Sequence, residues 1–166
     1  MQLIITILLV SLAIFALVAW VASRPRGRQL NALANVAEGT YERAKTYILD
    51  NTVGSAHLLA KLGNTVTDAD LCDASDVPFG VFQDPGAAAD SVAVEFLGKG
   101  RTKLGVADAA ITYADLLVPA AGGEVKKIPT DPGTYWVIGR AISTQATIGG
   151  IVEYVDCVPY QATVES

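Results

Sequence analysis

Histidine is almost absent from this sequence of 166 residues, which holds one, His57. A protein metal site usually joins several His, Cys or carboxylate ligands, and neither a second histidine nor a nearby cysteine accompanies His57. A serine triad would have to use this residue, and the G-x-S-x-G turn that presents a nucleophilic serine is missing. The sequence therefore predicts a non-enzymatic protein without catalytic residues, cofactor or metal.

Cysteine is nearly as scarce. Cys72 and Cys157 are the only two, too few for a scaffold built on disulfides, so the folded domain must depend on its own hydrophobic core. The two residues could form one bridge or remain as two buried thiols, and the sequence leaves both alternatives open.

Basic residues are few outside one short segment. From Gln29 to the C-terminus the chain carries nine Lys and Arg against seventeen Asp and Glu, a net charge of −8. Such a surface repels a phosphate backbone, and the sequence shows no basic face that could bind one. We therefore expect no nucleic-acid partner.

Charge is missing altogether from Met1–Ser23, MQLIITILLVSLAIFALVAWVAS. As an α-helix this segment would be about 34 Å long, close to the ~30 Å hydrocarbon core of a bilayer. Trp20 near its end suits a membrane interface. Arg24, Arg26 and Arg28 follow directly, where they could reach lipid headgroups. The pattern predicts a transmembrane-type helix over residues 1–23 with these four residues at its boundary.

The surroundings and the fate of this helix have alternatives. A cleaved signal peptide carries positive charge before its apolar run, whereas here the arginines follow the run, so we expect the helix to be retained. Its apolar surroundings could be a lipid bilayer or neighbouring helices of other copies. Because positive charges favour the cytoplasmic side, the rest of a single-pass chain would lie in the cytosol of the host before assembly.

Turn residues define the organisation of the remaining chain. Residues 24–39 are expected to form a basic boundary and connector, and residues 40–166 a structural domain. After Gly39, short strand-like runs follow at intervals of about 8–12 residues, separated by Gly, Pro, Asn and Asp. This pattern predicts an all-β fold, a small β-barrel or β-sandwich of about ten short strands. The predicted strands are Arg43–Leu49, His57–Leu62, Ala69–Cys72, Phe79–Gln83, Ser91–Leu97, Thr102–Val106, Asp115–Val118, Glu124–Ile128, Tyr135–Ile142 and Ile151–Cys157.

Alternation along these strands identifies a candidate core, because successive side chains of a strand point to opposite faces. It predicts that six side chains are buried: Val92, Val94, Phe96, Val137, Ile151 and Val155.

Two patterns are similar to binding motifs but lack their full signatures. Residues 98–100 (Gly-Lys-Gly) miss the rest of a phosphate-binding loop and are expected to form a hairpin turn. Four aspartates surround Cys72 without the order or the final glutamate of a calcium loop, so turn and strand-end roles are expected for them. These aspartates are Asp68, Asp70, Asp73 and Asp76.

Six blocks occur in an order that is shared with a known family. Ala69–Val81 is similar to a block of cysteine, small residues, Asp and x-Pro-x-Gly-Val. Ala107–Val118 is similar to an A-x-I-x-x-G-D-L-L block, with Ala114 in place of Gly. The other blocks are Ser91–Gly98, Gly122–Val125, Thr134–Ile142 and Gly150–Val155. Together they resemble the tailed-phage capsid decoration or cement proteins over about three quarters of the chain, although that family's pattern has no N-terminal hydrophobic helix.

The resemblance implies a virion structural protein that decorates or cements a capsid, here anchored by residues 1–23, for instance in a virion membrane. Its implied partners are further copies of itself, with a trimer favoured by analogy, and the major capsid protein or other virion proteins. Two other functions fit the same architecture. One is a pilin-like filament subunit with helices bundled in the core and β domains outside, and the other is a membrane-anchored binding module of the host.

Overall fold

The computed structural model describes residues 43–165. The predicted apolar helix over residues 1–23 and the connector over 24–39 lie outside them. Within the described part of the chain, no helix is long and apolar enough to cross a membrane. The helical element there is η2 (Ala121–Gly123), a single 3-10 turn. Residues 43–165 are therefore an all-β structure, as the turn spacing predicts.

Ten strands form close to the predicted positions, because Gly, Pro, Asn and Asp interrupt the apolar runs between them. The one large difference is the last strand, which continues seven residues beyond the predicted end at Cys157. The strands are β1 (Ala44–Leu49), β2 (Leu59–Leu62), β3 (Asp68–Leu71), β4 (Gly80–Phe82), β5 (Ser91–Phe96), β6 (Thr102–Val106), β7 (Leu116–Pro119), β8 (Val125–Lys127), β9 (Gly133–Ala141) and β10 (Ile151–Val164).

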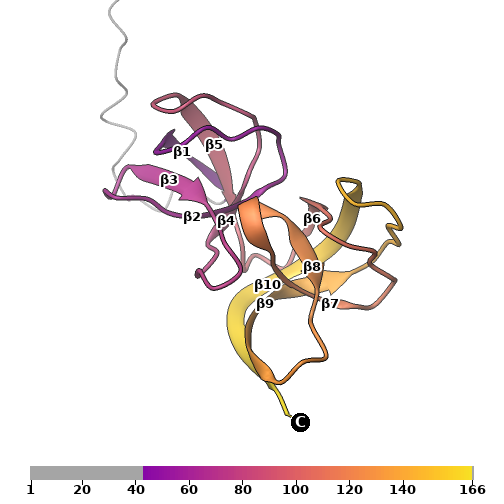
Figure 1. Cartoon of the computed structure of the whole chain (residues 1–166). Helices are drawn as coiled ribbons and strands as arrows, with labels where there is room; N and C mark the ends of the chain where they lie inside the picture. The colour runs from indigo at the N-terminus through magenta and orange to yellow at the C-terminus, as the bar shows by residue number, and fades with distance from the viewer. Residues whose placement is uncertain (1–42, 166) are drawn as a thin grey trace, which may run out of the picture. The chain divides into compact units, whose positions relative to one another are not determined.

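The first five strands close into a barrel in the order β1-β3-β2-β4-β5, with β5 pairing back onto β1. A ring with an odd number of strands cannot be antiparallel throughout. The parallel contact is that of β1 with β3, where Ile48 lies beside Asp68. Closure removes the free sheet edges at which strands of other molecules could pair. These strands, indigo to magenta, form one group in Figure 1.

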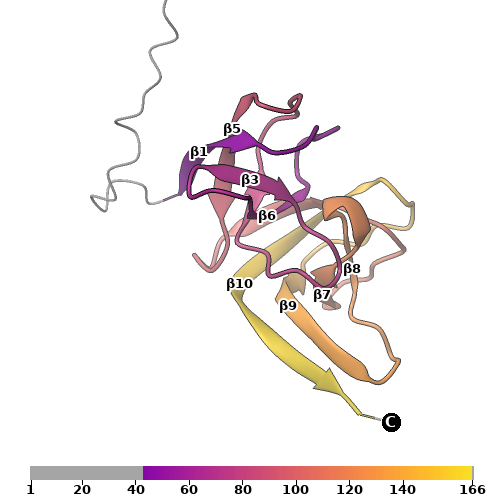
Figure 2. The ribbon, with the colours of Figure 1, turned by 60° about the vertical axis from the view of Figure 1, so that its left-hand side comes forward.

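The last five strands form a second sheet in the order β6-β10-β9-β7-β8, with antiparallel pairing throughout. A single parallel bridge between Ala107 and Val125 connects the end of β6 with β8, so this sheet curls towards closure. Figure 2 shows its two longest strands, β9 and β10, side by side. They are antiparallel, and β10 runs towards the C-terminus. The predicted barrel or sandwich is therefore a closed barrel joined to a second, half-closed sheet.

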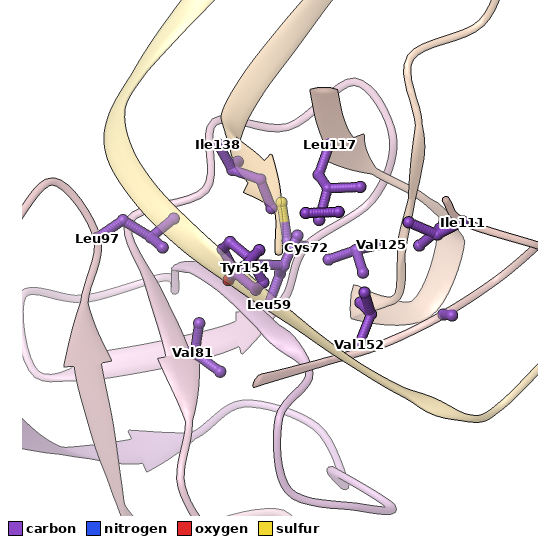
Figure 3. Packing of buried hydrophobic residues seen from close by; sticks show 12 residues of the cluster. Leu59, Cys72, Val81, Leu97, Ile111, Leu117, Val125, Ile138, Val152 and Tyr154 are labelled. Atoms are coloured by element: carbon purple, nitrogen blue, oxygen red, sulfur yellow. The ribbon is translucent and has the colours of Figure 1, made fainter. Parts of the chain in front are cut away.

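Two hydrophobic clusters hold these parts together, and the alternation in β2 and β4 contributes to both. Leu59 and Val81 belong to the cluster that the barrel shares with the second sheet, whereas Phe82 belongs to the cluster of the barrel itself. From β10, Val152 and Tyr154 enter the shared cluster, with Tyr154 near its centre (Figure 3). Since each fully buried side chain of this size contributes about 1.5–3 kcal/mol, the shared cluster keeps the barrel and the sheet in one folded unit.

The 3-10 turn η2 adds a polar link between the two parts. The Gly123 N–H donates to the Cys72 carbonyl (2.8 Å), and the Gly122 N–H donates to Asp73 Oδ1 (3.2 Å). Gly123 has a left-handed φ of +81°, and a Cβ there would lie 3.0 Å from atoms of Leu58, Leu59 and Leu71. The close approach of η2 to the barrel therefore requires glycine at this position.

The predicted core is correct for the strands of the barrel and for β9. Val92, Val94 and Val137 are buried. Phe96 is half-buried and packs against the cluster of the barrel, with its ring 6.2 Å from that of Phe79. The burial predicted for Phe96 is thus only partly correct, because the side chain lies near the end of β5.

The predicted burial of Ile151 and Val155 is wrong. Their side chains are 43% and 40% exposed, and the buried face of β10 carries Val152, Tyr154 and Asp156. Both faces of this strand are largely apolar, so alternation alone does not decide which of them is turned inward. The register with β6 and β9 decides it, since a shift of one residue would exchange the two faces.

Strand β10 is longer than predicted because a bulge accommodates Pro159. The register with β9 shifts between Asp156, opposite Gly139, and Tyr160, opposite Val137. Proline has no N–H to contribute to a sheet and is tolerated at such an irregularity. The strand therefore passes the proline and continues as a two-stranded ribbon with β9.

Candidate functional site

The predicted membrane-boundary residues Trp20, Arg24, Arg26 and Arg28 lie outside residues 43–165. Their role at the end of an apolar helix stays a prediction.

The two cysteines are free thiols. Cys72 is fully buried in the shared cluster, beside Leu59 in Figure 3. Burial, and to a smaller extent the Asp76 carboxylate, raises the pKa of its thiol to about 12. Cys157 is half-buried in β10, and burial also raises the pKa of its thiol. Because the thiolate is the reactive form, the raised pKa disfavours reaction of both thiols, and full burial additionally protects Cys72.

The aspartates around Cys72 accept hydrogen bonds in loops and at strand ends. Asp76 accepts from Lys61 Nζ (2.8 Å) and from the N–H of Asp73 (2.9 Å). These two hydrogen bonds, that of Lys61 first, hold the pKa of Asp76 below its usual value. Within residues 43–165 no three potential metal ligands converge. The structural roles expected for these aspartates are the ones they have.

His57 lies in the turn before β2, with a left-handed φ of +69°, rather than at the start of the strand as predicted. Its N–H donates to the Phe82 carbonyl (2.8 Å), and its carbonyl accepts from the N–H of Val106 (3.4 Å). The residue thus joins the backbone of the barrel to β6.

The hairpin predicted at residues 98–100 is wrong. β5 belongs to the barrel and β6 to the second sheet, so the loop between them crosses from one to the other. Gly98 and Gly100 both have left-handed φ angles, +83° and +64°. The Asp156 carboxylate accepts the N–H groups of Lys99 and Arg101, at 3.3 and 2.5 Å, and so holds the crossing in place.

Sequence reasoning missed a buried ion pair at the same junction. Lys103 of β6 is buried, and its Nζ lies 2.5 Å from Oε1 of Glu95 in β5. The contact brings two opposite charges together between the barrel and the second sheet. Alternation in β6 places Leu104 and Val106 on one face and would turn Lys103 outward, so no local pattern reveals the pair.

Tyr154 lies opposite Lys103 in the register of β10 with β6. Its hydroxyl is buried and has no hydrogen-bond partner among residues 43–165, and burial raises its pKa far above the usual value. The side chains of Lys103, Tyr154, Glu95 and Asp156 are the polar groups at the junction between the barrel and the second sheet. The arrangement can fix the position of one part against the other.

Comparison with known proteins relates this fold to a phage structure. No family model and no curated protein matches the chain. Among solved structures, the chain is similar to the N base of the head fiber gp8.5 in bacteriophage phi29, with a TM-score of 0.55 and 21% identity. The match covers 74% of this chain and 98% of that chain. The chain thus shares the fold of a phage head-fiber base.

Proposed function

We propose that this chain is a non-enzymatic structural protein of a phage particle, which decorates or cements the capsid as a homo-oligomer. The observation that carries the proposal is the fold shared with the phi29 head-fiber base, over 98% of that chain. Fold alone does not determine function. The sequence blocks that resemble tailed-phage decoration proteins support the same class of protein independently.

The polar and charged groups of the described residues support this role. The polar groups around Cys72 and Asp156 hold loops, and the Lys103–Glu95 pair joins the barrel to the second sheet. From Gln29 onward the chain is acidic, which disfavours contact with a packaged nucleic acid and leaves proteins as the natural partners. We propose that these partners are further copies of the chain and the major capsid protein or another virion protein.

The proposed anchor is the uncharged segment 1–23, held by a virion membrane or by neighbouring apolar helices. A charge at the centre of such a helix costs about 2.5–3.5 kcal/mol on insertion scales. Leu9→Arg is therefore expected to abolish incorporation into particles. Gln2→Arg introduces the same charge near the end of the segment and is the matched control, which should be incorporated normally.

The direct test is the composition of the native particle. Purified virions should contain the chain with an intact mass that includes residues 1–23, and antibodies against the β domain should label the capsid. A chain present only in filaments or in host membranes, and missing from virions, would overturn the proposal. A mass that begins near Ser23 would instead show cleavage and remove the anchor from it.

A further inference from the structure

The outer face of the second sheet carries a cluster of exposed apolar side chains. Direct cross-strand neighbours share a face of a sheet. Glu153 of β10 lies opposite Leu104 of β6, and its carbonyl accepts the N–H of Ile142, the residue that follows β9. Ile151 and Val155 lie two residues to either side of Glu153 on the same strand. These four apolar side chains are 38–43% exposed, and we name them, with Glu153 and Arg140, the outer face.

Strand β10 differs from an ordinary surface strand at this place. Its first five residues, Ile-Val-Glu-Tyr-Val, are apolar at every position except Glu153. A strand with one solvated face alternates apolar and polar residues, whereas a strand that is covered on both faces reads as a nearly continuous apolar run. Val152 and Tyr154 account for the inner face. The sequence of β10 therefore indicates that the outer face is covered as well.

Two opposite charges lie within this apolar surface. Glu153 stands between the four apolar side chains, and Arg140 of β9 lies opposite Val155, one step diagonally from Glu153. Arg140 donates to the Ala114 carbonyl (2.7 Å). Neither charged group takes part in an ion pair within residues 43–165. A partner that covers this face must therefore offer a cation to Glu153 and an anion to Arg140.

We propose that the outer face packs on a second copy of this chain, with Glu153 of each copy paired to Arg140 of its neighbour. This inference rests on the self-assembly in the proposed function and assigns it to a surface. A second copy is the occupant that supplies both charges from the same surface, as a self-complementary contact requires. Sheets that pack face to face in this way interlock their side chains at a separation of about 10 Å.

The contact can extend along β10 beyond the outer face. Val158 follows on the same strand and is exposed. After the bulge, Tyr160 lies opposite the buried Val137 and therefore does not belong to this face. A stable interface buries about 800 Å² of each partner, with an apolar centre and a polar rim. The outer face supplies such a centre, and the ribbon of β9 and β10 supplies further area beside it.

Charge reversal in the full-length chain tests the pairing. The dissociation constant for self-association would be measured in mild detergent by sedimentation velocity for the wild type, Glu153→Arg, Arg140→Glu and the double variant. Each single reversal places like charges together and should raise the constant at least about 30-fold. The double variant restores opposite charges and should return it to within about threefold of the wild type. Two matched reversals on the barrel, Asp84→Lys and Arg43→Glu, should leave it unchanged.

Arg140→Glu also removes the hydrogen bond from Arg140 to the Ala114 carbonyl and could therefore fail to fold. A variant at a different position tests the same face without this loss. Val155→Thr keeps the shape and strand preference of the side chain and removes apolar surface from the centre of the face. It should raise the dissociation constant at least about fivefold, with an unchanged circular dichroism spectrum.

The possible results distinguish a failure of the outer-face contact from a failure of the proposed self-assembly or capsid role. A wild-type chain that stays monomeric at tens of micromolar would overturn both the face and the proposed self-assembly. An oligomer that is insensitive to Glu153→Arg and Val155→Thr would overturn the face alone. Chains that associate through the outer face but are absent from virions would support the face and overturn the capsid role.

Discussion

The Lys103–Glu95 pair leads to a prediction in which the two partners are unequal. The side chain of Lys103 is 1% exposed and that of Glu95 is 23% exposed. Loss of either partner breaks the same 2.5 Å contact, but the group that remains has a different environment in each case. Glu95→Gln leaves an ammonium group without a counter-charge in the core, whereas Lys103→Met leaves a carboxylate that can turn towards water.

The expected magnitudes follow from this difference. Removal of one partner of a buried pair costs about 3–5 kcal/mol when the other charge stays buried. Glu95→Gln should therefore lower the free energy of unfolding by about 3 kcal/mol. Lys103→Met places an apolar chain of similar length among the residues around Tyr154, so its cost should stay within about 1 kcal/mol. The double variant removes both charges and should be close to Lys103→Met.

Urea unfolding of the full-length chain in mild detergent, followed by the circular dichroism of the strands, gives these differences as shifts of the midpoint at constant slope. Lys61→Met is the matched control, because Lys61 and Asp76 form a 2.8 Å pair whose side chains are about 30% exposed. Its cost should be within the ~0–1 kcal/mol of surface pairs. Equal losses for Glu95→Gln and Lys103→Met, or a larger loss for Lys103→Met, would refute the reasoning.

Three further predictions concern single positions. Gly139→Ala should lower the free energy of unfolding by about 1–3 kcal/mol or more, measured by thermal unfolding, because a Cβ there would meet the Val155 carbonyl of β10. Gly54→Ala is the control and should change stability little, because the space around its Cβ is open. Cys72 should resist alkylation at pH 8 and react only in urea, and rapid labelling of Cys72 itself in the native chain, located by peptide mapping, would contradict its burial. The lowered pKa of Asp76 adds stability that is complete above the ordinary carboxyl pKa of about 4 and is lost as the pH falls through the lower folded value. Asp76→Asn should therefore flatten the acid side of a plot of stability against pH, and an unchanged slope would exclude this contribution.

Strand positions could be predicted from the sequence because their signal is local. Turn residues interrupt apolar runs at regular intervals, and β6 (Thr102–Val106) begins and ends where the pattern predicts. The end of the last strand was predicted wrongly, at Cys157, because Pro159 follows it. Proline ordinarily ends a strand, and only the register of β10 with β9 shows that a bulge carries the strand past it.

The buried face of β10 could not be predicted from the sequence, and neither could the ion pair. Ile151 and Val155 on one face and Val152 and Tyr154 on the other are equally apolar, so alternation predicts two faces without saying which is inside. Lys103 is turned inward by the same register, next to Tyr154. A lysine at a core position becomes acceptable only because Glu95, from a different sheet, reaches its ammonium group.

The sequence by itself determined the all-β class, the number of strands, the acidic character of the β domain and the uncharged N-terminal segment. These properties depend on residues that are neighbours along the chain, or on composition alone. Tertiary structure decided the closure of the first five strands, the crossing at residues 98–100 and the exposure of the outer face. Each of these depends on which strands pair and in which register, and that is set by the joint burial of side chains far apart in the sequence.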